Sequence, residues 1–143
     1  MGKFLTCALA LIAFSAANAD EVLPQNCQKT VFSEEDSSYM DGYNCFYADR
    51  TILETYQIVK QDLRKRYPDD DDYKKLRDKL EVGKNHLDEF GEFLLIEYTW
   101  VPLAQQKELG YLKVTISYEA GDTTLLFVPQ KTGVLADISF YIQ

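Results

Sequence analysis

The feature that most constrains this chain is a change in the spacing of its apolar residues at Gly91. Upstream of Gly91 they recur every three or four residues, which is the period of an amphipathic helix. Downstream they recur every second residue, which is the period of a half-buried strand. Helices that precede a group of strands favour an α+β architecture. We therefore expect an α+β fold with an N-terminal arm and an antiparallel two-helix hairpin packed on a four-stranded antiparallel meander sheet.

The first predicted helix follows Cys45 and ends before Pro68. Its apolar stripe consists of Ala48, Ile52, Tyr56, Val59 and Leu63. Asn44 or Asp49 is placed to cap its first turn, because both side chains accept hydrogen bonds from free main-chain N–H groups. Pro68 ends the helix because the residue before a proline is driven out of helical geometry.

The second predicted helix starts at the acidic run of residues 69–72, which supplies an N-cap and favourable charge for the first turn. Its stripe consists of Tyr73, Leu76, Leu80, Gly83, Leu87 and Phe90. Only a short linker separates the two helices, so they are expected to form an antiparallel hairpin.

Four strands are expected after Gly91, at residues 94–100, 111–119, 123–128 and 134–142. Pro102, a hairpin signal at Gly121-Asp122 and a turn at residues 130–133 separate them. Residues 103–109 are expected to form a loop or a turn of helix. The connections are short enough for neighbouring strands to pair in antiparallel fashion.

Residues 1–19 have the three parts of a cleavable signal peptide. Lys3 gives the positive start, residues 4–14 are apolar, and Ala17-Asn18-Ala19 is the small-x-small site that a signal peptidase needs. A membrane anchor is the alternative, but a helix spans a bilayer only with roughly 20 apolar residues. The protein is therefore expected to be secreted or periplasmic after cleavage between Ala19 and Asp20, without a membrane span.

Two parts are expected after cleavage. Residues 20–44 are polar and lack periodicity, which predicts an irregular arm, and residues 45–143 form a single α+β domain. Cys27 and Cys45 survive cleavage, and an even number of cysteines in an oxidising compartment is usually paired. A disulfide between them would tie the arm to the first helix. Free thiols or a metal pair are the alternatives, although two cysteines alone make a poor zinc site.

The charge of the chain limits its partners. The formal net charge is −8 at pH 7, and loss of Lys3 makes it more negative. This argues against nucleic acid and anionic membrane surfaces, which are themselves negative, and it permits a cationic partner. The simpler interpretation is that the acidity only keeps a small secreted domain soluble.

Catalytic groups are scarce. His86 is the only histidine, and it is either a general base or, more simply, a partly exposed surface group. The sequence has no G-x-S-x-G elbow and no Gly-rich phosphate loop. The acids at residues 69–72 are contiguous and lack the glycine of a calcium loop. We therefore expect no cofactor and no metal, and we favour a binding protein over an enzyme.

Aromatic residues on the predicted sheet suggest two candidate sites. The face toward the helices carries a set that lines either a pocket for an apolar ligand or a filled core: Tyr98, Trp100, Tyr118 and Phe140. The opposite face carries Tyr111, Lys113 and Tyr141, and an aromatic face of mixed polarity is typical of protein-binding surfaces.

One segment resembles a known family. Cys45, Ala48-Asp49, Ile52 and Tyr56 are similar to the first helix of the LprI-type lysozyme inhibitors, which are exported helical hairpins with disulfides. The chain departs from that family in its shorter Cys45-to-Asp49 spacing, in Leu53 where the family has asparagine, and in lacking the family's tryptophan and closing cysteine. The similarity covers at most residues 27–90. The helix-then-sheet order also resembles cystatin-like and NTF2-like folds, in shape alone.

These observations lead to a first functional hypothesis and two alternatives. The first is an exported, non-enzymatic binding protein for a protein or peptide partner, and an inhibitor of a cationic secreted enzyme such as lysozyme is one concrete form. The second is a small-molecule pocket protein or isomerase-like enzyme, with a carboxylate such as Asp49 as base. The third is a structural subunit of an envelope assembly.

Overall fold

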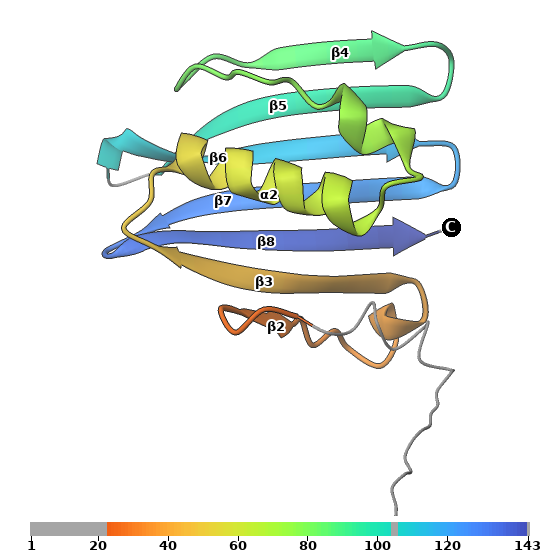
Figure 1. Ribbon diagram of the computed structural model, residues 1–143, viewed down its shortest axis with the longest axis horizontal. Helices are drawn as coiled ribbons and strands as arrows, with labels where there is room; N and C mark the ends of the chain where they lie inside the picture. Colours follow the sequence, from red (N-terminus) through yellow and green to blue (C-terminus); the bar gives the residue numbers. More distant parts are fainter. Residues whose placement is uncertain (1–22, 104–105, 143) are drawn as a thin grey trace, which may run out of the picture.

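The computed structural model describes residues 23–103 and 106–142 of the chain (Figure 1). Over these residues it is a seven-stranded antiparallel sheet with one α-helix lying across one of its faces. The predicted signal peptide at residues 1–19 and its cleavage site lie outside the described residues.

The strands are short at the two edges of the sheet and longer in the middle. They are β2 (Cys27–Lys29), β3 (Met40–Ala48), β4 (His86–Phe90), β5 (Leu94–Leu103), β6 (Gln106–Tyr118), β7 (Gly121–Gln130) and β8 (Gly133–Ile142). The helix is α2 (Ile52–Arg66), and the 3-10 helices are η2 (Asp36–Ser38) and η3 (Asp71–Lys75).

The order of the strands across the sheet is β2-β3-β8-β7-β6-β5-β4. Strands β4 to β8 form a meander in which each strand pairs with the next. The early strand β3 then pairs with the last strand β8, with Met40 opposite Tyr141 and Ala48 opposite Gly133. Helix α2 and the segment after it cross the sheet from β3 to the far edge at β4 (Figure 1).

The predicted two-helix hairpin on a four-stranded sheet is wrong. The segment expected to be the second helix consists of η3, an irregular strap at residues 76–85, and the edge strand β4. The segment expected to be an irregular arm contributes β2 and the start of β3 to the sheet. The helical spacing gave a wrong prediction because buried residues recur at this spacing without forming a helix. Tyr73, Leu76 and Leu80 are buried, but they belong to an irregular segment that packs on the core.

The strap does not need helical hydrogen bonds because side chains of α2 satisfy its main chain. Tyr56 Oη donates to the carbonyl oxygen of Arg77 at 2.6 Å, and Gln57 Nε2 donates to that of Asp78 at 2.6 Å. Lys60 is almost fully buried, and its ammonium group lies 3.3 Å from the Asp78 carboxylate. Buried carbonyl groups need such partners wherever a regular ladder is missing.

A helix is present where the first was predicted, but it begins at Ile52 and its cap is Thr51 rather than Asn44 or Asp49. Ala48, which was expected in its apolar stripe, is the last residue of β3. Thr51 and Glu54 form a capping box: the Glu54 N–H donates to Thr51 Oγ1 at 3.2 Å, and the Thr51 N–H donates to Glu54 Oε1 at 3.0 Å. Asp49 adopts a positive φ of 56°, which reverses the chain between β3 and the helix. The helix ends at Arg66, before Pro68 as expected.

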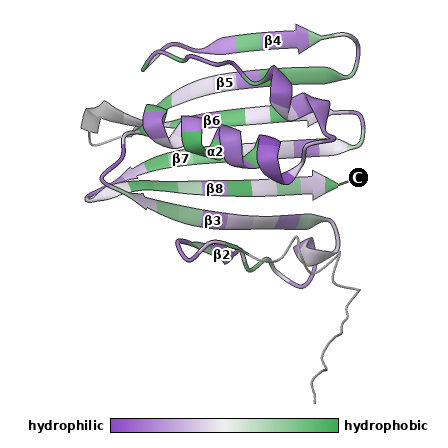
Figure 2. Cartoon of the chain, viewed as in Figure 1, coloured by the Kyte–Doolittle hydropathy of each residue, from purple (hydrophilic) through white to green (hydrophobic). Residues whose placement is uncertain are grey.

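The core lies between α2 with the strap and one face of the sheet. The outward side of α2 is hydrophilic (Figure 2), while Tyr56, Val59 and Leu63 face inward and are at most 2% exposed. Tyr56 contacts the rings of Tyr98 and Phe127 edge to face, with centroids 6.5 and 6.0 Å apart. The sheet contributes alternate residues, as period-two spacing requires: Ile96, Tyr98, Leu112, Val114, Ile116, Leu125, Phe127, Val134, Ala136 and Ile138.

The strands predicted after Gly91 are present, but their ends differ. Strand β5 runs through Pro102 to Leu103 and β6 begins at Gln106, so most of residues 103–109, expected to form a loop or a turn of helix, belong to strands. Gly121 and Asp122 begin β7, and the turn before them is at residues 119–120. Strand β7 also runs through Pro129, which was expected to stop it. The predicted disulfide is confirmed: Cys27 and Cys45 lie opposite each other on β2 and β3 and are bonded.

Candidate functional site

A groove opens at the end of the sheet where α2 begins, because β6 and β7 stop pairing there. Their ladder ends at Leu112 and Phe127. In the same register Gly110 would face Pro129, which has no N–H to donate. Strand β7 continues to Gln130 with β8 as its described partner. Gly110 and Pro129 both line the groove, so the interrupted ladder forms part of its floor.

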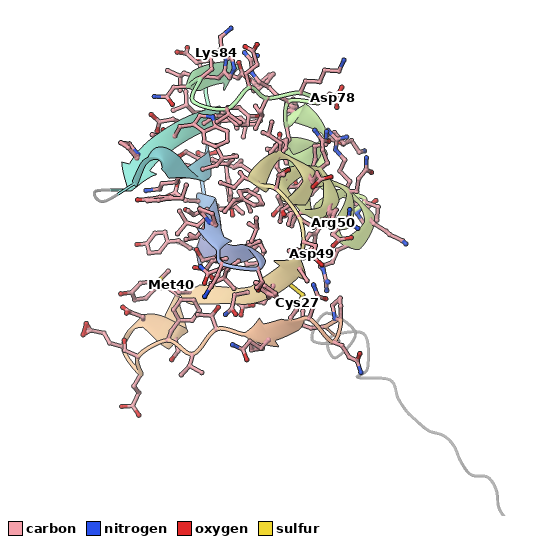
Figure 3. All side chains as sticks on the ribbon, turned by 90° about the vertical axis from the view of Figure 1, so that its left-hand side faces the viewer. Cys27, Met40, Asp49, Arg50, Asp78 and Lys84 are labelled. Atoms are coloured by element: carbon pink, nitrogen blue, oxygen red, sulfur yellow. A yellow bond between two sulfur atoms is a disulfide. The ribbon has the colours of Figure 1, made fainter. Side chains whose placement is uncertain are left out.

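The groove has a volume of about 580 Å³, which lies within the usual range for small-molecule sites. Its apolar lining comes from α2, the strap and three strands: Ile52, Leu53, Val82, Trp100, Pro129 and Val134. Its polar lining comes from the start of the helix and the β7–β8 turn: Asp49, Arg50, Thr51, Gln130, Lys131 and Thr132. Figure 3 looks onto this end of the molecule, with Asp49 and Arg50 labelled beside the helix. The arrangement is an apolar groove with a charged rim.

Hydrogen bonds fix the walls of the groove to one another. The Asp49 N–H donates to the Thr132 carbonyl at 2.9 Å and joins the start of the helix to the β7–β8 turn. The Trp100 N–H donates to Asn85 Oδ1 at 2.8 Å and joins the end of the strap to β5. The capping box holds the carboxylate of Glu54 on the Thr51 N–H, and this hydrogen bond lowers the pKa of Glu54. The groove is therefore largely preformed.

Trp100 is the only tryptophan in the chain, and it lines the groove. Its indole Nε1 is buried and has no hydrogen-bond partner within the described part of the chain. The indole therefore offers ring surface to a ligand rather than a hydrogen-bond donor. A single tryptophan at this place also makes its fluorescence a specific reporter of what the groove contains.

The four aromatic residues expected to form a pocket do not meet in one cavity. Tyr98 is fully buried in the core, where its hydroxyl accepts a hydrogen bond from the Arg77 N–H at 2.8 Å. Tyr118 lies beside the β4–β5 turn, and Phe140 packs against Tyr43 and Tyr67. Trp100 alone of the four lines the groove, and Asp49 lines it too.

The three residues expected to form a sheet-face site share the uncovered face but are spread along it. Tyr111 and Lys113 are neighbours on β6, with the aromatic ring half-buried and the lysine exposed. The register places Tyr141 on β8 six residues along the strand direction from the level of Tyr111, which is about 20 Å at the rise of a strand. Tyr141 also contacts Tyr39, with ring centroids 5.3 Å apart. The N-terminal segment thus covers that end of the face.

His86 and the acidic run lie away from the groove. His86 is on the edge strand β4, next to Tyr98 in the register. Within residues 23–103 and 106–142, no three His, Cys, Asp or Glu side chains gather in a way that could hold a metal ion. Asp71 pairs with Lys74 at 2.9 Å, which lowers its pKa, and this local pairing suits an exposed start of η3.

Sequence reasoning missed most of the groove. The sequence pattern predicts separate elements for four of its lining residues: a helix for Arg50 and Leu53, a turn for Lys131 and a strand for Val134. The available signal was the position of Pro129: a proline within an alternating apolar pattern marks the place where a ladder ends.

Comparison with known proteins adds no family. A scan against protein-family models, a search of curated proteins and a search of solved structures each find no match. Among the helices of the described residues, none has the length and apolar character needed to cross a membrane. The disulfide is compatible with an extracellular or periplasmic protein.

Proposed function

We propose that this chain is an exported, non-enzymatic binding protein that holds a small amphipathic ligand in the groove beside Trp100. The observation that carries the proposal is the groove itself: about 580 Å³, with an apolar floor and charges only at the rim. An apolar ligand body gains roughly 25 cal/mol for each Å² removed from water. A few polar groups at the rim then fix its orientation.

The residues at the groove favour binding over catalysis. Asp49 is its lone carboxylate among the residues described as lining it, and it is exposed at the rim. An efficient general base is normally shielded and paired with an orienting group, as in the sites of known acid–base enzymes. His86 is not among the residues that line the groove.

Trp100 fluorescence tests the proposal. Titration of the processed protein with decanol, a neutral single-chain amphiphile, is expected to change the emission of Trp100 in a saturable way. Val82 lines the groove but is 70% exposed, so Val82→Glu should leave the fold intact. It should weaken decanol binding about tenfold, since burial of a valine side chain is worth about 1.5 kcal/mol.

A matched control separates the groove from general effects of charge. Val31 is 94% exposed and is not among the residues that line the groove, so Val31→Glu adds the same charge elsewhere. It should leave the titration unchanged. Absence of a saturable Trp100 response with amphiphiles of every charge would overturn the proposal, as would equal weakening by the two variants.

A second candidate function is protein binding through the uncovered face of the sheet. The protein would then inhibit a cationic enzyme by binding it through this face. The observation that favours it is a group of exposed apolar side chains at the β4–β5 end: Leu87, Phe93 and Leu95, which are 54%, 60% and 36% exposed. Such groups mark interaction sites more often than chance. An inhibition assay with lysozyme distinguishes the candidates: Phe93→Ala should abolish inhibition and Val82→Glu should not.

A further inference from the structure

The groove carries two positive charges at adjoining positions. In the β3–β8 pairing Ala48 lies opposite Gly133, and the Asp49 N–H donates to the Thr132 carbonyl at 2.9 Å. The start of the helix and the β7–β8 turn are therefore hydrogen-bonded to each other, and Arg50 and Lys131 are the next residues along these two segments. Both residues line the groove.

These two cations are not neutralised by ion pairs. No salt bridge links Arg50 or Lys131 to an acid in the part of the chain that the structure describes. In the same acidic chain Lys29, Lys60 and Arg77 all have carboxylate partners. Like charges on neighbouring segments destabilise each other, and the cost is removed when an anion lies between them.

We propose that the ligand of the groove is a single-chain amphiphile with a carboxylate head, which binds between Arg50 and Lys131 while its apolar chain lies against Leu53, Val82 and Trp100. This inference rests on the proposed function, because it specifies what the same groove holds. Arg50 offers a guanidinium fork that matches a carboxylate, and Lys131 adds a second positive charge.

The other charged groups near the head-group position do not reverse this preference. Asp49 also lines the groove, so the rim carries two cations and one carboxylate. Glu54 accepts the Thr51 N–H in the capping box and is not among the lining residues, but Arg50 lies near enough for its charge to contribute to the lowered pKa of Glu54. A net positive rim in a chain of net charge −8 is a local exception that favours an anion over a cation.

The test compares three ligands with the same ten-carbon chain and different heads, each kept below its micelle concentration. Trp100 emission is titrated with decanoate, decanol and decyltrimethylammonium at low salt. Decanoate is expected to bind about tenfold more tightly than decanol, and the cation more weakly than both. The preference should shrink as salt is added, because the rim is exposed and screened.

Two sets of variants separate the head-group site from the groove. The double variant Arg50→Gln/Lys131→Gln should lose the preference for decanoate while its affinity for decanol stays the same. Lys113→Gln removes one positive charge from the uncovered face, where Lys113 is exposed. It should keep the preference.

The outcomes distinguish this inference from the function on which it rests. If the three ligands bind equally, or if the double variant keeps the preference for decanoate, the carboxylate inference is wrong while the groove remains a binding site. If none of the three changes Trp100 emission, the proposed function fails as well.

Discussion

The hydroxyl of Tyr56 donates a hydrogen bond to the main-chain carbonyl of Arg77 at 2.6 Å. The main-chain N–H of Arg77 donates to the hydroxyl of Tyr98 at 2.8 Å. Two buried tyrosines, one from α2 and one from β5, therefore satisfy both main-chain groups of Arg77. This fixes the strap against the core and determines where Val82 and Asn85 reach the groove.

Tyr56→Phe tests this coupling. The substitution keeps the ring contacts with Tyr98 and Phe127 but leaves the Arg77 carbonyl with only its longer contact to Lys60 Nζ at 3.5 Å, which should lower the free energy of unfolding by about 1–2 kcal/mol. Urea denaturation measures the change. Tyr111→Phe is the control, since that ring is half-buried on the uncovered face, and it should stay within about 0.5 kcal/mol of the parent. Equal effects would show that the hydrogen bond contributes nothing specific.

The ion pair of Arg77 and Asp88 predicts a dependence on pH. Both carboxylate oxygens accept from the guanidinium at 2.8 Å, and these hydrogen bonds lower the pKa of Asp88. A lowered pKa in the folded state stabilises the protein above the unfolded value, about 3.9, and this contribution disappears as the pH falls through the folded value.

Asp88→Asn should therefore destabilise the protein at neutral pH and not in acid. Because Arg77 is 39% exposed, the loss at neutral pH should be about 1 kcal/mol or less. Urea denaturation of parent and variant at about pH 7 and about pH 3 gives the two differences. A difference that is the same at both pH values would contradict the assigned role of the pair.

The disulfide should contribute a substantial part of the stability of the sheet edge. Cys27 and Cys45 are 18 residues apart, and the chain-entropy relation gives about 3 kcal/mol for a loop of this size. The double variant Cys27→Ala/Cys45→Ala should lose this amount in urea denaturation. The variant should also show a larger increase in amide exchange rate in β2 than in β7. If β2 stays as protected as β7, the disulfide is not what holds the edge strand.

The helix cap should matter for both stability and the groove. Thr51→Ala removes the oxygen that accepts the Glu54 N–H at 3.2 Å and should cost about 1 kcal/mol. Since Thr51 also lines the groove between Arg50 and Ile52, decanoate should bind less tightly to this variant. Thermal unfolding and the Trp100 titration measure the two effects, and an unchanged melting temperature would argue against the capping box as a stabilising element.

The sequence predicted the elements whose own pattern decides their structure. The stripe from Ile52 to Leu63 forms a helix because its spacing, its capping residues and Pro68 agree. The alternation from Val134 to Ile138 likewise forms a strand with one buried face. The disulfide could also be derived from the sequence, whereas the arrangement of one helix on a seven-stranded sheet could not.

The errors arose where tertiary contacts override local pattern. Residues 73–80 carry helical spacing, yet side chains of α2 bind their carbonyl groups and hold them in an irregular strap. The polar residues before Cys45 form strands because β8 offers them an edge. The groove depends on where the β6–β7 ladder ends, and no local pattern indicates that Arg50 and Lys131 will line the same groove.

The measurement that tests the central claim most directly is to map decanoate binding on the isotope-labelled protein by NMR chemical shifts. The groove predicts saturable shifts at the amides of Arg50, Leu53 and Lys131 and at the indole N–H of Trp100, with little change at Lys113. Shifts confined to the uncovered sheet face, or no saturable shifts at all, would contradict it.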